Sequence, residues 1–180
     1  MNRHFFGDSY DLVKRFFCRE LKSLGYVVAI DPMFTGAWGG DKHKFFCLVG
    51  VKPEAKARGT SPGGVLFLDP DTGVHERGGE RHVSLHRVAE EASKYEVVFS
   101  FDQSFSYGGN ARAAMLKKFA ILNSLGCHAM YYDSHARFLF ASRGRTPLRA
   151  LRAHLVSLGL PADRLVESAR RNSVNPSRSP

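Results

Sequence analysis

Carboxylates follow four short apolar segments of this 180-residue chain, each at the point where the segment ends. They are Asp31, Asp69 with Asp71, Asp102 and Asp133. Carboxylates in such places can orient a water molecule, stabilise positive charge on a sugar or hold a divalent cation. Aspartate is also common after a strand because it caps helices and closes turns, and for any one position that explanation has equal weight. Four such positions together favour a shared site.

The segments before these acids are apolar and short, as expected of strands that are buried on both faces. They span 26–30, 65–68, 96–101 and 128–132. Segments with helical periodicity alternate with them, which predicts an α/β fold in a single domain, with a mainly parallel central sheet flanked by helices. Ligands of such sheets bind at the carboxyl ends of the strands, where the four acids lie.

The apolar periodicity predicts helices at 9–24, 84–93, 110–125 and 146–157. A further strand at 138–142 is expected to pair with 128–132 as a hairpin. The segment 42–51 fits either a helix or a strand, and 74–81 is charged and glycine-rich, as loops are.

The chain is strongly basic, with 26 Lys and Arg against 17 Asp and Glu, a net charge of +9. Eight of the arginines lie in 140–180, opposed there by Asp163 and Glu167 alone. Such a balance favours a polyanionic partner, and we expect a nucleic acid in preference to a generally basic protein that has no such partner. Lys14 and Lys118 fall outside the apolar stripes of their predicted helices, so both are expected to face solvent.

The length suits one folded domain, which we expect to span 1–162, followed by a basic flexible tail at 163–180. No apolar run approaches the roughly 20 residues that cross a bilayer, so no membrane partner is expected. The cysteines Cys18, Cys47 and Cys127 are widely spaced in apolar surroundings, which is typical of a reducing compartment. We therefore expect a cytoplasmic protein, and a monomer, although nothing in the sequence sets the oligomeric state.

Aromatic and basic side chains lie in the loops that carry the acids. Phe34 follows Asp31 in a glycine-rich loop, and Phe105 follows Asp102. Either ring could stack on a flat ligand, or could instead fold back over the core.

Familiar signatures for nucleotide, metal or nucleophilic chemistry are absent from the sequence, including the P-loop, GxGxxG, HExxH and CxxC. The segment Asp-Pro-Met-Phe-Thr-Gly at 31–36 resembles the motif, an Asp-Pro and an aromatic residue after a strand, with which the uracil-DNA glycosylase superfamily activates water. Asp-Ser-His-Ala-Arg at 133–137 lies where that superfamily has its DNA-insertion loop.

The resemblance implies a DNA glycosylase that flips out a natural or modified base and hydrolyses its N-glycosidic bond without a cofactor. Asp31 would orient the water, with Asp69 and Asp71 as partners or rivals. The residues expected to bind substrate are Phe34, Asp102, Phe105, Asp133, His135 and Arg137.

Two other enzymatic interpretations stay open. A nuclease would use Asp31, Asp69, Asp71 and Asp102 to hold Mg²⁺. Alternatively, the segments 7–14 and 30–36 resemble the opening of ribosomal-RNA adenine methyltransferases, and Leu-Asp-Pro-Asp at 68–71 falls where those enzymes carry Asp-Pro-Pro-Tyr. A nucleic-acid-binding module without catalysis is the remaining alternative. We expect a hydrolase that acts on DNA, a glycosylase in preference to a nuclease.

Overall fold

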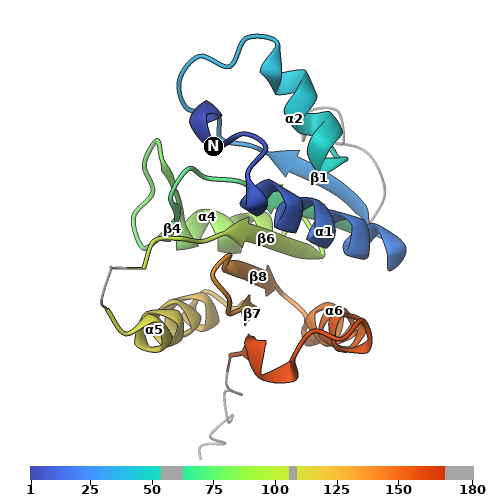
Figure 1. Ribbon diagram of the computed structural model, residues 1–180. Coiled ribbons are helices and arrows are strands. Elements are labelled where there is room, and N and C mark those ends of the chain that lie inside the picture. The colour runs from blue at the N-terminus through green and yellow to red at the C-terminus, as the bar shows by residue number, and fades with distance from the viewer. Residues whose placement is uncertain (54–62, 106–108, 169–180) are drawn as a thin grey trace, which may run out of the picture.

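A computed structural model of the chain describes residues 1–53, 63–105 and 109–168. The described residues form a seven-stranded sheet in the order β2-β1-β3-β6-β8-β7-β9 (Figure 1). The strands are β1 (Val27–Asp31), β2 (Lys52–Pro53), β3 (Gly64–Leu68), β6 (Val97–Phe101), β7 (His128–Tyr132), β8 (Phe138–Ser142) and β9 (Leu165–Glu167). The sheet is mostly parallel, which confirms the predicted α/β fold.

Four of the strands, β2, β1, β3 and β6, pair in parallel. β8 is antiparallel to both of its neighbours, β6 and β7, so the predicted hairpin between 128–132 and 138–142 is confirmed. It also follows that β7 runs in the same direction as β6. The carboxyl ends of β1, β3, β6 and β7 therefore lie along one edge of the sheet.

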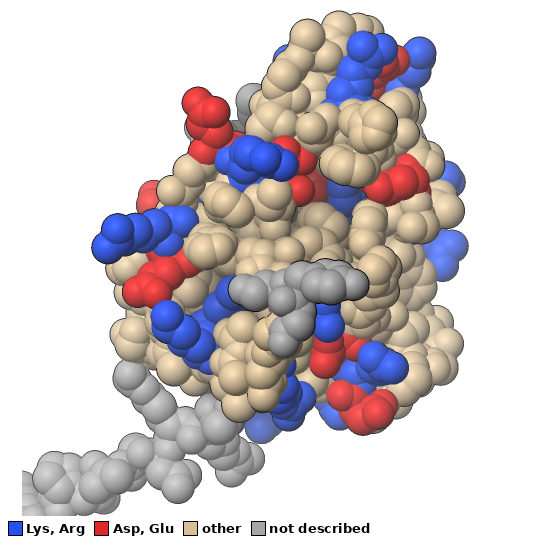
Figure 2. Space-filling view, turned by 60° about the vertical axis from the view of Figure 1, so that its left-hand side comes forward, with Lys and Arg blue, Asp and Glu red and all other residues tan. Residues whose placement is uncertain are grey.

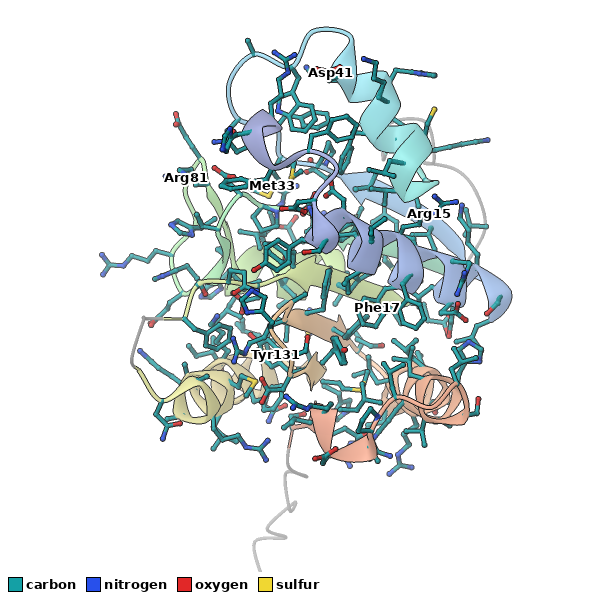
Figure 3. All side chains as sticks on the ribbon, in the orientation of Figure 1. Arg15, Phe17, Met33, Asp41, Arg81 and Tyr131 are labelled. Carbon is teal, nitrogen blue, oxygen red and sulfur yellow. The ribbon has the colours of Figure 1, made fainter. Side chains whose placement is uncertain are left out.

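Helices cover both faces of the sheet, as Figure 1 shows. The helices are α1 (Ser9–Ser23), α2 (Asp41–Val49), α4 (Leu85–Glu91), α5 (Ala111–Ser124) and α6 (Arg145–Ser157). One apolar cluster joins α1, α2 and α6 to one face through residues such as Phe17 and Leu151. The other joins α4 and α5 to the opposite face and includes Tyr131. Figure 3 shows Phe17 on the side of α1 and Tyr131 on the side of α5.

The central strands are buried because their sequences carry almost no polar groups. Every side chain of Val65, Leu66, Phe67 and Leu68 is inaccessible to solvent. Successive residues of a strand point to opposite faces, so Val65 and Phe67 join the α1 cluster while Leu66 and Leu68 join the α4 cluster. The same alternation decides where the acids after each strand point.

Three segments differ from the sequence-based expectation or complete it. The ambiguous segment 42–51 is mainly helical, as α2. The expected loop 74–81 is wrong at its first two residues, which belong to β4 (Gly73–His75); β4 pairs with β5 (His82–Ser84) in a separate two-stranded sheet. β9 pairs with β7, so the folded chain extends past the expected boundary at 162. The rest of the expected tail, 169–180, lies outside the described residues.

Within the part of the chain that the structure describes, no helix combines the length and the apolar character that crossing a membrane requires.

Candidate functional site

The acids at the strand ends do not converge on one point. Asp31 pairs with Arg87 of α4, and Asp102 pairs with Lys118 of α5. Asp69 turns to the opposite face. The alternation along the strands separates these carboxylates, although all of them lie at the same edge.

Each carboxylate also has a cation of its own. The ion pairs are Asp31–Arg87, Asp69–Lys14, Asp71–Arg81, Asp102–Lys118 and Asp133–Arg137. In the described ranges no three His, Cys, Asp or Glu side chains are grouped so that they could hold a metal ion. The four acids of the nuclease hypothesis are thus brought to one edge but not to one site.

Lys14 lies at the centre of a buried ionic group, which we call the Lys14 triad, with Asp11 and Asp69. Its side chain is only 2% exposed, and its ammonium nitrogen lies 2.9 Å from Asp11 Oδ1 and 3.0 Å from Asp69 Oδ2. The expectation that Lys14 faces solvent was wrong. Lys14 belongs to the buried stripe of α1, because successive members of that stripe are three or four residues apart: Asp11, Lys14, Phe17 and Leu21.

Burial and the neighbouring charges act in opposite directions on the pKa values of Asp69 and Lys14. Burial raises the pKa of Asp69, against the opposing effect of the Lys14 charge. Burial would lower the pKa of Lys14, but Asp69 and Asp11 together raise it above its usual value. Among the described residues, Asp69 Oδ1 has no hydrogen-bond partner. Two carboxyl groups within 3.0 Å thus offset the loss of hydration of the buried Lys14 ammonium.

Asp102 has a structural role between β6 and β4. Its Oδ1 accepts a hydrogen bond from Val74 N at 2.9 Å, and its Oδ2 accepts one from the Tyr131 hydroxyl at 2.6 Å. Lys118 completes the group and is 12% exposed, so the expectation that it faces solvent was also wrong. Burial raises the pKa of Tyr131 and lowers that of Lys118. The fully buried Asp102 carboxylate has no face left for a substrate.

The two predicted stacking rings are held by other side chains. Phe34 packs against Trp38, with ring centroids 4.4 Å apart, and against Phe45. The loop after β1 thus folds back over the core. Phe105 lies beneath Lys118, whose ammonium is 4.5 Å from the ring centroid, and beside Arg137. Asp31, with Arg87 on its carboxylate, lies outside the cavity described next.

A cavity of about 340 Å³ opens at the carboxyl ends of β3 and β6, and we call it the Tyr10 cavity. It is lined by Met1, Phe5, Asp8, Tyr10, Lys14, Pro70, Asp71, Thr72, Arg81, Phe101 and Gln103. The rings of Tyr10 and Phe101 lie 5.2 Å apart and form an aromatic wall. Phe5 is half exposed. Carboxylate, amide and guanidinium groups surround this wall, a combination that suits a flat heterocycle with polar edges.

His135 supports the Tyr10 cavity from behind. Its ring stacks on Tyr10, and its Nε2 lies 2.7 Å from the Tyr10 hydroxyl. The Gln103 amide donates to the main-chain carbonyl of His135. Of the site residues expected from sequence, Asp71 lines the cavity and His135 fixes its wall, whereas Asp133 and Arg137 pair with each other.

Sequence reasoning missed Tyr10, Lys14 and Gln103. A signal for the first two was available. A helix that leads into a strand of a parallel sheet runs antiparallel to it, so its first turn returns to the carboxyl edge. Asp8 begins α1 by accepting hydrogen bonds from Tyr10 N and Asp11 N, and so places Tyr10 at that edge.

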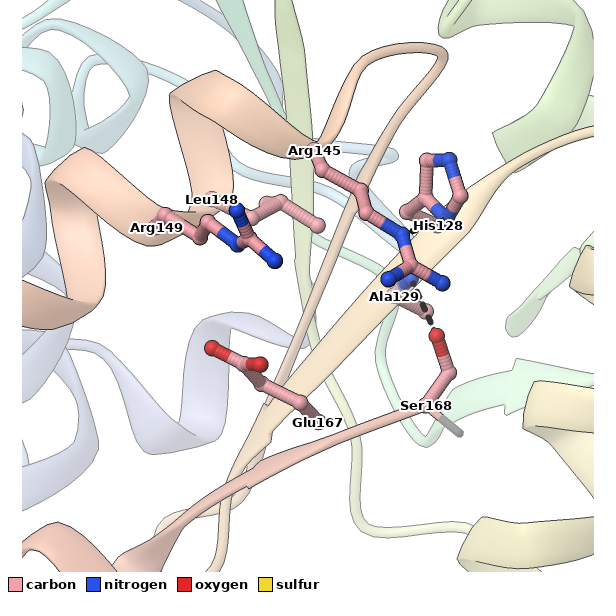
Figure 4. Close-up of a pocket in the computed structure, with 7 residues that line it drawn as sticks. All are labelled: His128, Ala129, Arg145, Leu148, Arg149, Glu167 and Ser168. Carbon is pink, nitrogen blue, oxygen red and sulfur yellow. Dashed lines mark hydrogen bonds between the residues drawn. The ribbon is translucent and has the colours of Figure 1, made fainter. Parts of the chain in front are cut away.

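A second, much smaller hollow of about 30 Å³ lies at the opposite edge of the sheet, between β7, β9 and the start of α6 (Figure 4). Arg145 donates to His128 Nδ1 there, and burial lowers the pKa of His128. The space holds about one or two water molecules.

Basic and acidic side chains alternate on the face shown in Figure 2 and do not form one continuous basic surface there. The described strand-end acids each neutralise one cation, which explains part of this alternation. No protein-family model, no curated protein and no solved structure matches the chain.

Proposed function

We propose that this protein binds a nucleic acid, takes one base into the Tyr10 cavity and hydrolyses the N-glycosidic bond of that base. The observation that carries the proposal is one cavity that combines the Tyr10–Phe101 wall with the carboxylate of Asp71. Its volume falls in the range of about 300–1,000 Å³ that is usual for small-ligand sites. The net charge of +9 supports a polyanionic substrate.

Hydrolysis of an N-glycosidic bond requires an anion near the sugar and hydrogen bonds that hold the base. Asp71 is 3% exposed, accepts from Arg81 Nε at 2.9 Å and lies 3.4 Å from the Thr35 hydroxyl oxygen. Such a fixed carboxylate would orient a water molecule and stabilise the cationic sugar as its bond to the base breaks. The water gives its hydroxyl to the sugar carbon and its proton to the departing base. Gln103 would hydrogen-bond the edge of that base.

This proposal assigns to Asp71 the role that the sequence suggested for Asp31. Asp71 lines the cavity, whereas Asp31 does not and is bound to Arg87. The test follows from this difference. Asp71→Asn should lower the rate of base release by about 100-fold or more. The Asp31→Asn variant should still release the base.

The assay uses labelled single- and double-stranded DNA and RNA, with natural and modified bases. Base release from DNA appears as strand breaks formed only after alkali, with or without EDTA. Direct breaks that EDTA abolishes would show a nuclease and overturn the proposal. Alkali-dependent breaks lost in Asp31→Ala but retained in Asp71→Asn would contradict the assignment of the carboxylate.

A second candidate, a methyltransferase-like nucleic-acid-binding protein, is favoured by one observation. The segments 7–14 and 68–71, which carry that resemblance, meet at the Tyr10 cavity through Asp8, Tyr10 and Pro70. The residues present do not fit the methyl-donor cofactor. In the loop after β1, the Thr35 N–H and the Trp38 indole N–H both donate hydrogen bonds to the main-chain carbonyl of Met1, so neither is available to a cofactor. Binding without base release, weakened by Tyr10→Ala, would support this candidate.

A further inference from the structure

Two hollows share a wall at the carboxyl edge of the sheet. Beside the Tyr10 cavity lies an outer hollow of about 450 Å³, lined by Asn2, Arg3, Thr35, Gly36, Ala37, Asp71, Glu80 and Arg81. Asp71 and Arg81 line both spaces. A ligand that fills the Tyr10 cavity and extends past this ion pair therefore enters the outer hollow.

Arg81 presents an unused hydrogen-bonding edge at this boundary. Its Nε donates to Asp71 Oδ2 at 2.9 Å, and within the described residues no acceptor is bound to its two terminal nitrogens. The side chain is 59% exposed. Two parallel N–H groups on a planar guanidinium match the spacing of two phosphate oxygens.

Arg3 adds a second guanidinium to the outer hollow. Its Nε and one terminal nitrogen both contact Asp41 Oδ2 at 2.7 Å, and its side chain is 60% exposed. Glu80 lines the same space and opposes these charges. The balance between Arg81, Arg3 and Glu80 would therefore set the affinity for an anion.

We infer that the outer hollow is a phosphate subsite, with Arg81 as the group that binds a phosphate next to the base in the Tyr10 cavity. The inference rests on the proposed function and narrows its substrate class. The ligand is a phosphorylated nucleotide or a nucleic-acid strand, not a free base or nucleoside. Because Arg81 also holds Asp71, the same side chain would couple phosphate binding to the position of the hydrolytic carboxylate.

The test compares ligands that differ only by a phosphate. Isothermal titration calorimetry of the full chain with the common nucleosides and with their 3′- and 5′-monophosphates should show tighter binding of a monophosphate, by about tenfold or more. Arg81→Gln should remove this gain, and Arg81→Lys should retain only part of it, because lysine keeps the charge but not the paired donors. Glu80→Gln should strengthen monophosphate binding.

Arg77→Gln is the matched control, since Arg77 lies between β4 and β5, is exposed and lines neither hollow. It should retain the phosphate gain. Nucleoside binding that Tyr10→Ala abolishes, with no gain from phosphate, would overturn the inference and leave the cavity proposal standing. A gain that persists in Arg81→Gln would also overturn it. Failure of both nucleosides and monophosphates to bind would overturn the inference and count against the base-binding cavity itself.

Discussion

At the scale of single residues, the Lys14 triad places a buried cation against the Tyr10 cavity, which Lys14 lines. A lysine is tolerated in a protein interior when anions offset the loss of hydration, and Lys14 has two such anions. Replacing Lys14 with an uncharged residue would leave two fully buried carboxylates, Asp11 and Asp69, without their cation. The loss of stability in a Lys14 variant would therefore include the penalty of burying two unpaired carboxylates.

We predict that Lys14→Met lowers the free energy of unfolding by about 3–5 kcal/mol, as measured by urea denaturation. The loss should shrink at acidic pH. Burial already raises the pKa of Asp69, and without Lys14 that pKa rises further. An acid whose folded pKa is raised binds protons more readily in the folded state, so stability is regained as the pH falls through that pKa.

Arg15→Met is the control for Lys14→Met, because Arg15 is exposed on the same helix and should change stability by less than about 0.5 kcal/mol. Lys14→Met combined with Asp69→Asn should restore part of the loss. Equal stability of Lys14→Met and Arg15→Met would show that Lys14 is not buried as described.

At the scale of elements, the turn that follows β3 connects Asp69 and Asp71 to β4. Gly73 begins β4 with a φ of 115°, in the region that favours glycine. A Cβ atom there would lie 2.4 Å from Asp102 Oδ1 and 2.7 Å from Gln103 N. This glycine lets β4 approach the carboxylate that receives the Val74 N–H.

Gly73→Ala should therefore destabilise the protein by about 3 kcal/mol or more, from backbone strain together with steric overlap. Gly36→Ala provides the comparison, since Gly36 also has a positive φ of 73° but no atom within 4 Å of the added Cβ. It should cost about 1–2 kcal/mol, from strain alone. Thermal unfolding measures both, and similar losses would contradict the close approach.

The sequence predicted the positions of the main strands better than the directions of the acids that follow them. The strands β1, β3, β6, β7 and β8, and the edge at which the acids lie, followed from short apolar runs and the residues that stop them. The face to which each acid points did not, because a shift of one residue reverses it. Asp31 is the last residue of β1, whereas Asp69 comes after β3 has ended, so two acids in apparently equivalent places turn to opposite faces. Helix periodicity failed for Lys14 because a buried lysine is counted as polar.

At the scale of the whole molecule, the sheet is completed by residues that sequence reasoning assigned to a tail. β9 pairs with β7, and Leu165 and Val166 are 3% and 7% exposed. The signal was weak because β9 is only three residues long and lies in an arginine-rich region. Its apolar side chains nevertheless close the end of both helical layers.

A chain that ends at Ala162 should be less stable than one that ends at Ser168 by about 3 kcal/mol or more, since it loses two buried apolar side chains and the pairing of β7. Chemical denaturation of the two shortened chains measures the difference. Equal stability would show that β9 contributes nothing to the fold.

The insertion of β8 between β6 and β7 has a consequence for how the chain avoids aggregation. β6 is uncharged and apolar but for Ser100, and its outer edge is covered by β8, which comes about forty residues later in the sequence. Until β8 has been synthesised and paired, that edge presents unsatisfied N–H and C=O groups to any other strand. An exposed Val-Val-Phe-Ser-Phe segment has the composition that recruits further copies into cross-β assemblies. Once it has paired, the β7–β8 hairpin covers this edge as well as completing the native sheet.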